Sequence, residues 1–258
     1  MLKVNNIHYS VGRKKILNGV STGFAPGLLH VIVGPNGSGK STFLKIFSGD
    51  LHKYSGTVLY EDRTIAEFKK EDLAKRRSVM SQQPELGFPL TVEEVVMMGR
   101  YPHFQFNPNK KDGVICDEVM QRLKLSSFGE RNYLTLSGGE KQRVQFARAL
   151  AQVWENPSAG HRYLFLDEPL NNLDINYQQE FLKLSNEFAK TNTILIAILH
   201  DINLALAYAD RIIFMKAGRI AYETEPLGVT EAMIKEVFDV NVAIIRPADV
   251  AHPVVIYQ

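Results

Sequence analysis

A glycine-rich segment that ends in a lysine and a serine is the strongest candidate for chemistry in this chain of 258 residues. The segment consists of Gly34, Pro35, Asn36, Gly37, Ser38, Gly39, Lys40 and Ser41, and Thr42 follows it. Its glycines let consecutive backbone N–H groups curve around phosphate oxygens without a Cβ in the way. Lys40 adds a positive charge for β- and γ-phosphates, and Ser41 offers its hydroxyl to Mg²⁺. The spacing G-x-x-x-x-G-K-S therefore predicts a nucleotide phosphate site.

Two adjacent carboxylates, Asp167 and Glu168, follow the apolar run Tyr163 to Leu166. A strand of this kind ends at the carboxyl edge of a parallel sheet, where open α/β folds bind their ligands. We expect Asp167 to hold Mg²⁺ through water, and Glu168 to orient or deprotonate the water that attacks the phosphate. The alternative is a solvated Asp-Glu pair that opens a loop.

The segment Leu136 to Arg143, with the sequence LSGGEKQR, leads into an apolar-periodic stretch. Ser137 and Glu140 have the spacing of a helix capping box, which explains both residue types without a ligand. A capping box does not explain the adjacent Gly138 and Gly139, which lower helix stability and indicate that another group approaches the backbone closely. A phosphate at this second helix N-terminus fits that requirement.

The expected elements place these residues at sheet edges and helix starts. The run Leu28 to Val33 predicts a buried strand that leads into the glycine-rich segment and then into an amphipathic helix. The N-terminal residues 2–24 alternate as short strands do, with a turn at Gly12. Further strands are expected at Tyr163–Leu166, Ile194–Leu199 and Ile212–Met215, and helices at Val92–Met98, Val114–Leu123, Lys141–Trp154, Tyr177–Lys190 and Ile202–Ala209.

This order predicts an α/β fold with interleaved lobes. We expect residues 1–83 to form an N-terminal antiparallel β region and the first part of a core, and residues 84–155 to form an inserted α-helical subdomain. Residues 156–258 then complete the core and add a C-terminal segment.

The composition excludes several classes of protein. A net charge of +2, spread along the chain, is too mild to predict a nucleic-acid partner. Cys116 is the one cysteine, so the chain has no internal disulfide or cysteine cluster, and a reducing compartment is expected. The N-terminus lacks the apolar stretch of a secretory signal, and the most apolar region, residues 193–215, contains too many polar residues for a membrane span.

The segment LSGGEKQR resembles the signature of the ABC family, which distinguishes that family from other phosphate-loop NTPases. The resemblance extends over essentially the whole chain. It implies a RecA-like phosphate-loop NTPase core that binds and hydrolyses ATP with Mg²⁺. It also implies that two copies pack head to tail, with Ser137, Gly138 and Gly139 of one copy contacting the γ-phosphate held by Lys40 of the other.

Further motifs of the family match in order and spacing. Gln82 stands at the Q-loop, where the resemblance implies contact with the metal and the water, although the neighbouring Gln83 is an alternative. Asp174 closes the segment NNLD, which matches the D-loop at the dimer seam. His200 follows an apolar strand and matches the switch histidine that contacts the γ-phosphate. By itself, a histidine at a strand end is more often structural.

The chain departs from the family pattern at two positions. The aromatic residue that stacks on adenine normally precedes the first turn glycine, where this chain has Val11. Tyr9, two residues earlier, is our candidate for the stacking residue. Leu170 replaces a common threonine after Glu168 and Pro169, with little effect expected.

The stretch Gly87 to His103, the segment WENP at 154–157 and the terminal residues 252–257 resemble importers of iron chelates, vitamin B12 and hemin, and the hemin importers most of all. This resemblance implies a peripheral subunit on the cytoplasmic face of the inner (plasma) membrane. Its partners would be a permease dimer and, indirectly, a substrate-binding protein. Import of a ferric siderophore or cobalamin is the alternative cargo.

Two rival interpretations come from other classes. A soluble ABC ATPase of DNA maintenance would carry a long coiled coil between the phosphate loop and the signature, and one of translation would carry two cassettes in one chain. This chain has a short helical segment there and a single cassette. A nucleotide kinase outside the family would leave LSGGE and His200 unexplained.

Overall fold

The computed structural model describes residues 1–81 and 86–258, which form two compact units. One unit combines Met1–Glu67 with Leu182–Gln258, and the other is Phe68–Phe181. Helix α6, Ile175–Ala189, crosses from the second unit into the first. The expected boundary at 83/84 lies outside the described residues, and the boundary at 155/156 stays a prediction.

The first unit opens with an antiparallel sheet, as its alternating sequence predicts. Its strands are β1 (Leu2–Val11), β2 (Lys14–Phe24), β4 (Ser55–Tyr60) and the short β5 (Arg63–Thr64), in the order β2-β1-β4-β5. Leu2, Val4 and Ile7 are fully buried. The sheet is therefore half apolar, with one face packed in the core of this unit.

A second sheet of this unit has β3, Leu29–Val33, between two parallel neighbours. The neighbours are β8 (Thr193–Ile198) and β9 (Arg211–Lys216), and β10 (Arg219–Thr224) pairs antiparallel with β9. Every residue of β3 and β8 is buried. Their continuous apolar runs are typical of parallel strands that are covered on both faces.

The remaining elements of the first unit are short. They are α1 (Lys40–Phe47), η1 (Ile65–Glu67), α7 (Ile202–Tyr208), η5 (Pro226–Gly228), α8 (Glu231–Phe238) and a C-terminal hairpin of β11 (Val242–Ile245) and β12 (Val254–Tyr257). The hairpin strands pair antiparallel, from Val242 opposite Tyr257 to Ile245 opposite Val254.

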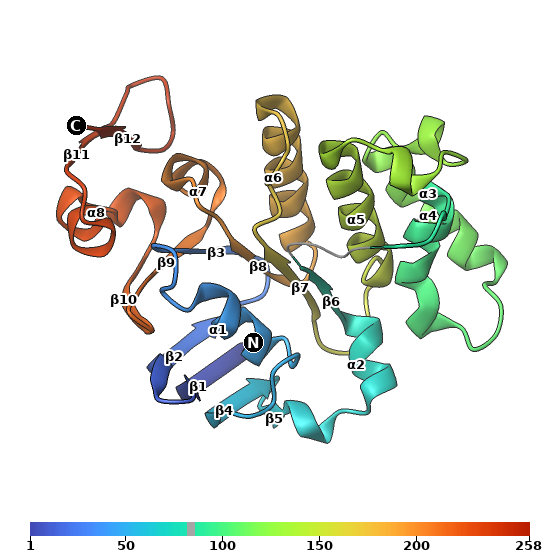
Figure 1. Cartoon of the computed structure of the whole chain (residues 1–258), viewed down its shortest axis with the longest axis horizontal. Helices are drawn as coiled ribbons and strands as arrows, with labels where there is room; N and C mark the ends of the chain where they lie inside the picture. The colour runs from blue at the N-terminus through green and yellow to red at the C-terminus, as the bar shows by residue number, and fades with distance from the viewer. Residues whose placement is uncertain (82–85) are drawn as a thin grey trace. The chain divides into compact units, whose positions relative to one another are not determined.

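The second unit is mainly helical, as expected for the inserted segment (Figure 1). Helices α3 (Val92–Met97), α4 (Lys110–Arg122) and α5 (Gly138–Gln152) pack against one another. The unit also contains α2 (Lys70–Arg76), the parallel pair β6 (Arg77–Met80) and β7 (Arg162–Asp167), and the 3-10 turns η2 (Met98–His103), η3 (Ser126–Phe128) and η4 (Tyr133–Thr135).

Helix α4 starts four residues before the expected start at Val114. Asn109 is the reason, because its side chain accepts hydrogen bonds from the backbone N–H groups of Lys111 and Asp112. The carboxylate of Asp112 returns a bond to the backbone N–H of Asn109 at 2.9 Å. This capping box adds a polar first turn that apolar periodicity does not reveal.

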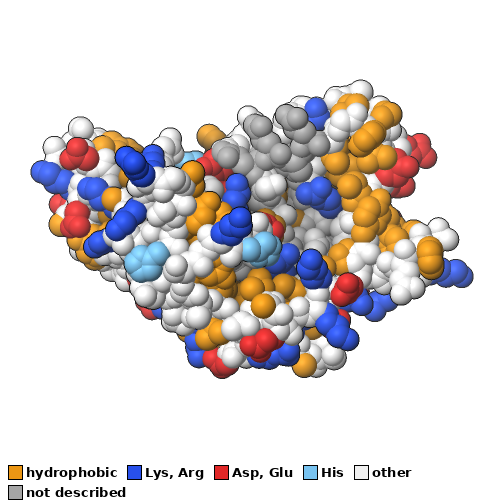
Figure 2. All heavy atoms as spheres, turned by 60° about the horizontal axis from the view of Figure 1, so that its bottom comes forward, with side chains coloured by type: hydrophobic (Ala, Val, Ile, Leu, Met, Phe, Trp, Pro, Cys, Tyr) orange, Lys and Arg blue, Asp and Glu red, His pale blue; other side chains and the backbone are white. Residues whose placement is uncertain are grey.

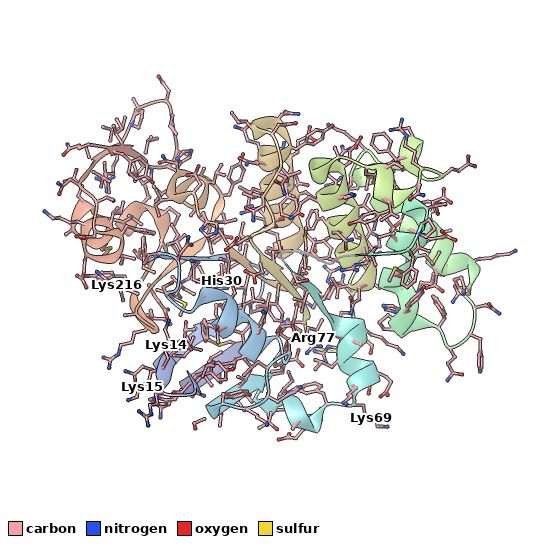
Figure 3. All side chains as sticks on the ribbon, viewed as in Figure 1. Lys14, Lys15, His30, Lys69, Arg77 and Lys216 are labelled. Atoms are coloured by element: carbon pink, nitrogen blue, oxygen red, sulfur yellow. The ribbon has the colours of Figure 1, made fainter. Side chains whose placement is uncertain are left out.

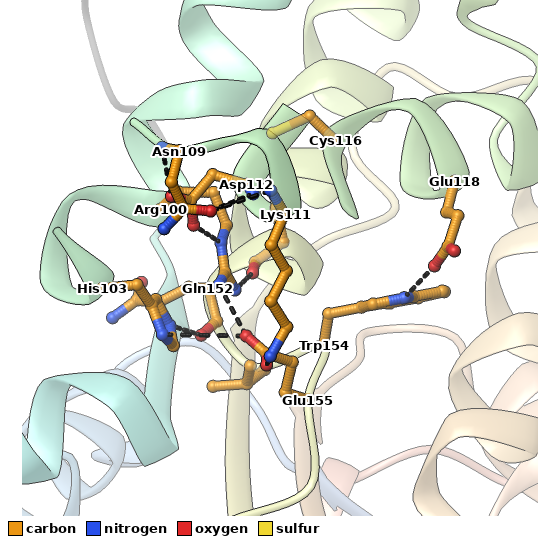
Figure 4. A network of polar contacts seen from close by, with 12 residues as sticks. Arg100, His103, Asn109, Lys111, Asp112, Cys116, Glu118, Gln152, Trp154 and Glu155 are labelled. Atoms are coloured by element: carbon orange, nitrogen blue, oxygen red, sulfur yellow. Dashed lines mark hydrogen bonds and ion pairs between the residues drawn. The ribbon is translucent and has the colours of Figure 1, made fainter. Parts of the chain in front are cut away.

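The second unit buries the guanidinium of Arg100, which is 1% exposed (Figure 4). It donates to Asp112 Oδ1 at 3.0 Å, to Ala151 O at 2.8 Å and to Glu155 Oε2 at 2.6 Å. Lys111 pairs with the same Glu155 from the surface. Three well-placed acceptors therefore offset the desolvation of this cation.

One face of the surface carries charges of both signs. Lys and Arg side chains are interspersed with Asp and Glu over the face drawn in Figure 2. Among residues 1–81 and 86–258, every helix is too short or too polar to span a bilayer. Cys116 is buried, and its burial raises the pKa of the thiol to about 12.

Candidate functional site

The phosphate loop joins the end of β3 to the start of α1 in the first unit. Gly39 holds the N-cap position of α1 at φ 101°, in the left-handed region. A Cβ on Gly39 would lie 2.8 Å from Leu17 Cδ2 and 3.0 Å from Ile16 O. A Cβ on Gly34 would collide with the carbonyl oxygen of Met215. Glycine is therefore required at both ends of the loop by close packing as well as by conformation.

Lys40 and Ser38 put polar atoms into this loop. The Lys40 side chain is buried, and its ammonium donates to Gly34 O at 2.8 Å and to Pro35 O at 3.2 Å. Ser38 is 2% exposed, and within the described residues its Oγ has no hydrogen-bond partner. A buried hydroxyl, an ammonium and a helix N-terminus together suit a ligand rich in anionic oxygens.

The parallel pairing of β3 with β8 brings His200 to the same sheet edge as the phosphate loop. Ile32 pairs with Ile198, so Gly34 and His200 lie two residues beyond this pair on adjacent strands. The backbone N–H of Leu199 continues the ladder by donating to Ile32 O at 3.2 Å. His200 is exposed at this edge. The first unit thus unites two of the predicted contacts to a γ-phosphate.

In the second unit, Asp167 is the last residue of the fully buried strand β7, and Glu168 follows it. Asp167 is 4% exposed, whereas Glu168 is half-buried and has φ 51°. Left-handed backbone is costly for a residue with a side chain, and such strain gathers at functional sites. Asn171 donates from Nδ2 to Glu168 Oε2 at 3.2 Å. The carboxylate is thus held from the loop that follows it.

The predicted capping box at Ser137 is present at the start of α5. Ser137 Oγ accepts from the backbone N–H of Glu140 at 3.3 Å, and Glu140 Oε2 accepts from the backbone N–H of Ser137 at 2.7 Å. The hydrogen bond from the Ser137 backbone, followed by that from its side chain, lowers the pKa of Glu140. The serine and the glutamate therefore have a local structural role, whatever ligand the helix end takes.

The adjacent glycines have a neighbour within the same unit, Asn172. A Cβ on Gly138 would lie 3.3 Å from Asn172 Cβ, and one on Gly139 would lie 3.0 Å from Asn172 O. Gln142, one turn further along α5, donates to Pro169 O at 2.8 Å. The LSGG segment is therefore packed directly on the loop that follows Glu168, a contact that the motif alone does not predict.

A cavity of about 530 Å³ opens at this junction. Its lining combines the signature with the D-loop, and consists of Phe128, Ser137, Gly138, Gly139, Glu140, Arg143, Asn172, Leu173, Asp174 and Tyr177. The Arg143 guanidinium lies 4.3 Å from the ring centroid of Tyr177 and 5.5 Å from that of Phe128. Asp174 accepts from the backbone N–H of Tyr177 at 3.0 Å, so it also caps α6. Sequence reasoning included Arg143 in LSGGEKQR and Asn172 in NNLD without giving either a role, and it missed Tyr177, because only the fold brings these side chains together.

Two residues predicted to contact the nucleotide, Gln82 and Tyr9, are not assigned to the phosphate-loop residues or to the signature residues described above. Gln82 and its alternative Gln83 lie outside the described residues. Tyr9 pairs with Leu17 in the N-terminal sheet and is partly exposed, while Val11 at the turn is 60% exposed. Adenine stacking by Tyr9 stays a prediction.

Known proteins have sequences similar to that of this chain. A family model described as ABC transporter matches residues 17–171. A hemin import ATP-binding protein HmuV of Chelativorans sp. (strain BNC1) is 40% identical over 240 residues, covering 93% of this chain and 91% of that protein. The protein of that name from Gloeobacter violaceus is 38% identical over 257 residues, covering 99% of this chain and 94% of that one.

Solved structures give the same picture of the fold. A dimeric bacterial ABC transporter cassette superimposes with a TM-score of 0.73 at 29% identity, covering 89% of this chain and all of that one. A metal-chelate type ABC transporter in an inward-facing conformation has a TM-score of 0.81 and covers 100% of this chain and 96% of that one. Its sequence identity of 21% limits this second likeness to the fold.

Proposed function

Because the chain belongs to the ABC transporter family, we propose that it is the subunit that hydrolyses ATP to power import through a permease. The observation that carries the proposal is the presence of two anion-suited helix starts in one chain. One is the phosphate loop with Lys40, and the other is Ser137-Gly138-Gly139 beside the 530 Å³ cavity. A kinase or GTPase site needs only the first.

ATP would bind through the backbone of Gly34 to Ser41, with Thr42 following on α1 and Tyr9 against the base. Lys40 neutralises the β- and γ-phosphates, and the Ser38 hydroxyl, which has no partner among residues 1–81 and 86–258, finds an acceptor there. Ser41, Asp167 and Gln82 would hold Mg²⁺, either directly or through water. Bound Mg²⁺ supplies the charge that offsets the negative charge of the reacting phosphates.

Glu168 orients or deprotonates the attacking water, and Asn171 fixes the direction of its carboxylate. His200, at the end of the strand beside the phosphate loop, contacts the γ-phosphate. Gln82 links the metal and the water to the permease contact. The roles divide between residues that bind the triphosphate and residues that act on the water.

The assembly we propose is a head-to-tail homodimer under a permease dimer, on the cytoplasmic face of the membrane. In it, Ser137 to Gly139 of one copy complete the γ-phosphate site of the other, and Asp174 lies at the seam. Closure of the two copies on ATP, followed by hydrolysis and reopening, drives the permease. The region from Gln82 to His103 transmits the movement.

The cargo we propose is hemin, delivered by a substrate-binding protein. The names of its relatives support it, at 38–40% identity over nearly the full chain. A ferric siderophore or cobalamin is the alternative cargo for the same machinery. The match to transporter subunits along this length disfavours a soluble ABC ATPase of DNA maintenance or translation.

Replacement of Glu168 by Gln tests the catalytic assignment. We expect ATP binding to persist and steady-state hydrolysis to fall by at least about 100-fold, because the amide cannot accept the proton of water. Bound nucleotide and phosphate release are measured on the same preparation. Glu180→Gln, which removes a surface carboxylate paired with Lys124 at 2.5 Å, is the matched control and should hydrolyse normally. Rapid steady turnover by Glu168→Gln would contradict the assignment.

The cargo is tested with the chain reconstituted in vesicles with its permease and binding protein. ATP hydrolysis is measured with hemin, a ferric siderophore or cobalamin, each at saturating concentration. We expect stimulation by hemin alone. Stimulation by another compound would support the role in transport but assign a different cargo. No stimulation by any of them would favour a soluble ATPase.

A further inference from the structure

The C-terminal strand β12 is joined to helix α7 by a single side-chain amide, that of Asn203. Asn203 donates from Nδ2 to Val255 O at 3.1 Å, and Asn203 Oδ1 accepts from the backbone N–H of Val255 at 2.8 Å. Both main-chain groups of Val255, a residue only 3% exposed, are thus satisfied by one amide. The amide takes the place that a neighbouring strand has in a sheet.

Asn203 lies in the first turn of α7, three residues after His200. Asp201 is the N-cap of this helix, and its Oδ1 accepts from the backbone N–H of Asn203 at 2.7 Å and of Leu204 at 3.3 Å. Ile202 between them is 2% exposed. The cap, the buried residue and the amide therefore connect the strand β12 to the segment that directly follows His200.

The hydroxyl of Tyr257, at the end of β12, is influenced by the charge of the same cap. Burial raises the pKa of the Tyr257 hydroxyl, and the negative charge of Asp201 raises it further. The hydrogen bonds of Asn203 to Val255 place the strand beside the helix start. Helix α7 packs against β3 as well as against β12 of the C-terminal hairpin.

We infer that Asn203 is a positioning residue, through which the C-terminal strand holds His200 in the orientation that meets the γ-phosphate. The inference rests on the proposed function, because it presumes that His200 contacts the nucleotide. Residues far from the chemistry act in this way when a small displacement of a contacting group lowers the rate. The side-chain amide of Asn203 bonds to the main chain of Val255.

The hairpin offers a matched control, since it is anchored at a second point away from His200. Glu231 on α8 accepts from the backbone N–H of Ile244 on β11 through Oε1 at 2.9 Å. Removing this bond loosens the same hairpin without touching α7. A variant at Glu231 therefore separates a general effect of hairpin packing from an effect that passes through the amide.

The experiment compares Asn203→Ala, Asn203→Asp and Glu231→Ala in the full chain, each also combined with His200→Ala. ATP affinity, the rate of ATP hydrolysis and urea unfolding are measured for every variant. We expect Asn203→Ala to lower kcat about ten-fold while the Kd for ATP changes less than two-fold, as for loss of an interaction made in the transition state. Asn203→Asp keeps the acceptor but loses the donor, so its kcat should lie between those of wild type and Asn203→Ala. Glu231→Ala should keep the wild-type rate.

The background of His200→Ala decides whether the effect passes through the histidine. We expect Asn203→Ala to cause no further loss there, since residues that act as a unit are not additive. Equal losses with and without His200, or a loss in Glu231→Ala as large as in Asn203→Ala, would overturn the inference. Full activity of His200→Ala alone would instead refute the histidine's role in the proposed function. If Asn203→Ala does not fold, Asn203→Asp provides the same comparison.

Discussion

His30 is a histidine in the core, on the central strand β3 (Figure 3). It is 1% exposed, its Nε2 lies 3.0 Å from Ala25 O, and the edge of its ring meets Phe24 with centroids 5.2 Å apart. Within the described residues, its Nδ1 has no partner. Burial lowers the pKa of the imidazole, and Arg211 lowers it further, against opposing effects of the Ala25 carbonyl and Asp210. The folded state therefore holds His30 neutral.

This burial predicts a loss of stability in mild acid. The unfolded chain protonates His30 near pH 6.5 while the folded chain does so only at lower pH, so the unfolded state binds more protons between these values. Stability is full above about pH 6.5 and falls below it, by at most ~1.4 kcal/mol per pH unit for this group. Urea unfolding at several pH values measures the slope.

The matched variants are His30→Gln, whose amide still donates to Ala25 O, and His52→Gln at an exposed position. We expect the stability of His30→Gln to depend less on pH below 6.5 than that of wild type, and His52→Gln to follow wild type. An unchanged slope in His30→Gln would show that other groups cause the acid sensitivity.

At the scale of the elements, α5 connects the signature to the Arg100 cluster. Its N-terminus carries Ser137 to Gly139, and its C-terminal carbonyls are capped by Arg100 at Ala151 and by the imidazole of His103 at Gln152 O, 2.8 Å away. A Cβ on Gly99 would collide with Arg148 O, so η2 lies directly on α5. Cationic groups at a helix C-terminus are favourable partners for its dipole.

Removing the buried cation should destabilise this unit strongly. Arg100→Met leaves the carboxylate of Asp112, 1% exposed, without its partner, and we expect a loss of about 3 kcal/mol in the free energy of unfolding. Lys111→Met removes a cation that is 68% exposed from the same cluster, and should cost less than about 1 kcal/mol. Urea unfolding of both variants gives the comparison, and equal losses would mean that burial does not govern the cluster.

The elements differ in how far the sequence predicts them. Strands β3, β7, β8 and β9 appear within a residue of their expected bounds, because continuous apolar runs identify buried parallel strands. Helix α4 starts earlier than expected, because its first turn is polar and depends on Asn109. The C-terminal hairpin was expected only as a segment, since its short strands give no clear periodicity.

At the scale of the whole chain, the family and the chemistry are predictable because their residues are local in sequence. Gly34 to Ser41, LSGGE and the pair Asp167-Glu168 are each continuous segments. The bond from Asn203 to Val255 is not predictable, because its partners are 52 residues apart and one of them is main chain. The packing of Asn172 on Gly138 and Gly139 is likewise not predictable from the sequence. Placement of Gln82 and of Tyr9 against a nucleotide remains a prediction.

The approach of Asn172 to Gly138 and Gly139 also constrains which sequences can occur at these positions. A side chain at either glycine meets the loop of Asn172, and at Gly139 the obstacle is backbone that cannot rotate away. Substitutions at Gly138, Gly139 and Asn172 therefore depend on one another. A larger residue in one segment fits only when the other segment moves. In a set of related sequences, substitutions in the signature and in the NNLD loop should therefore occur together.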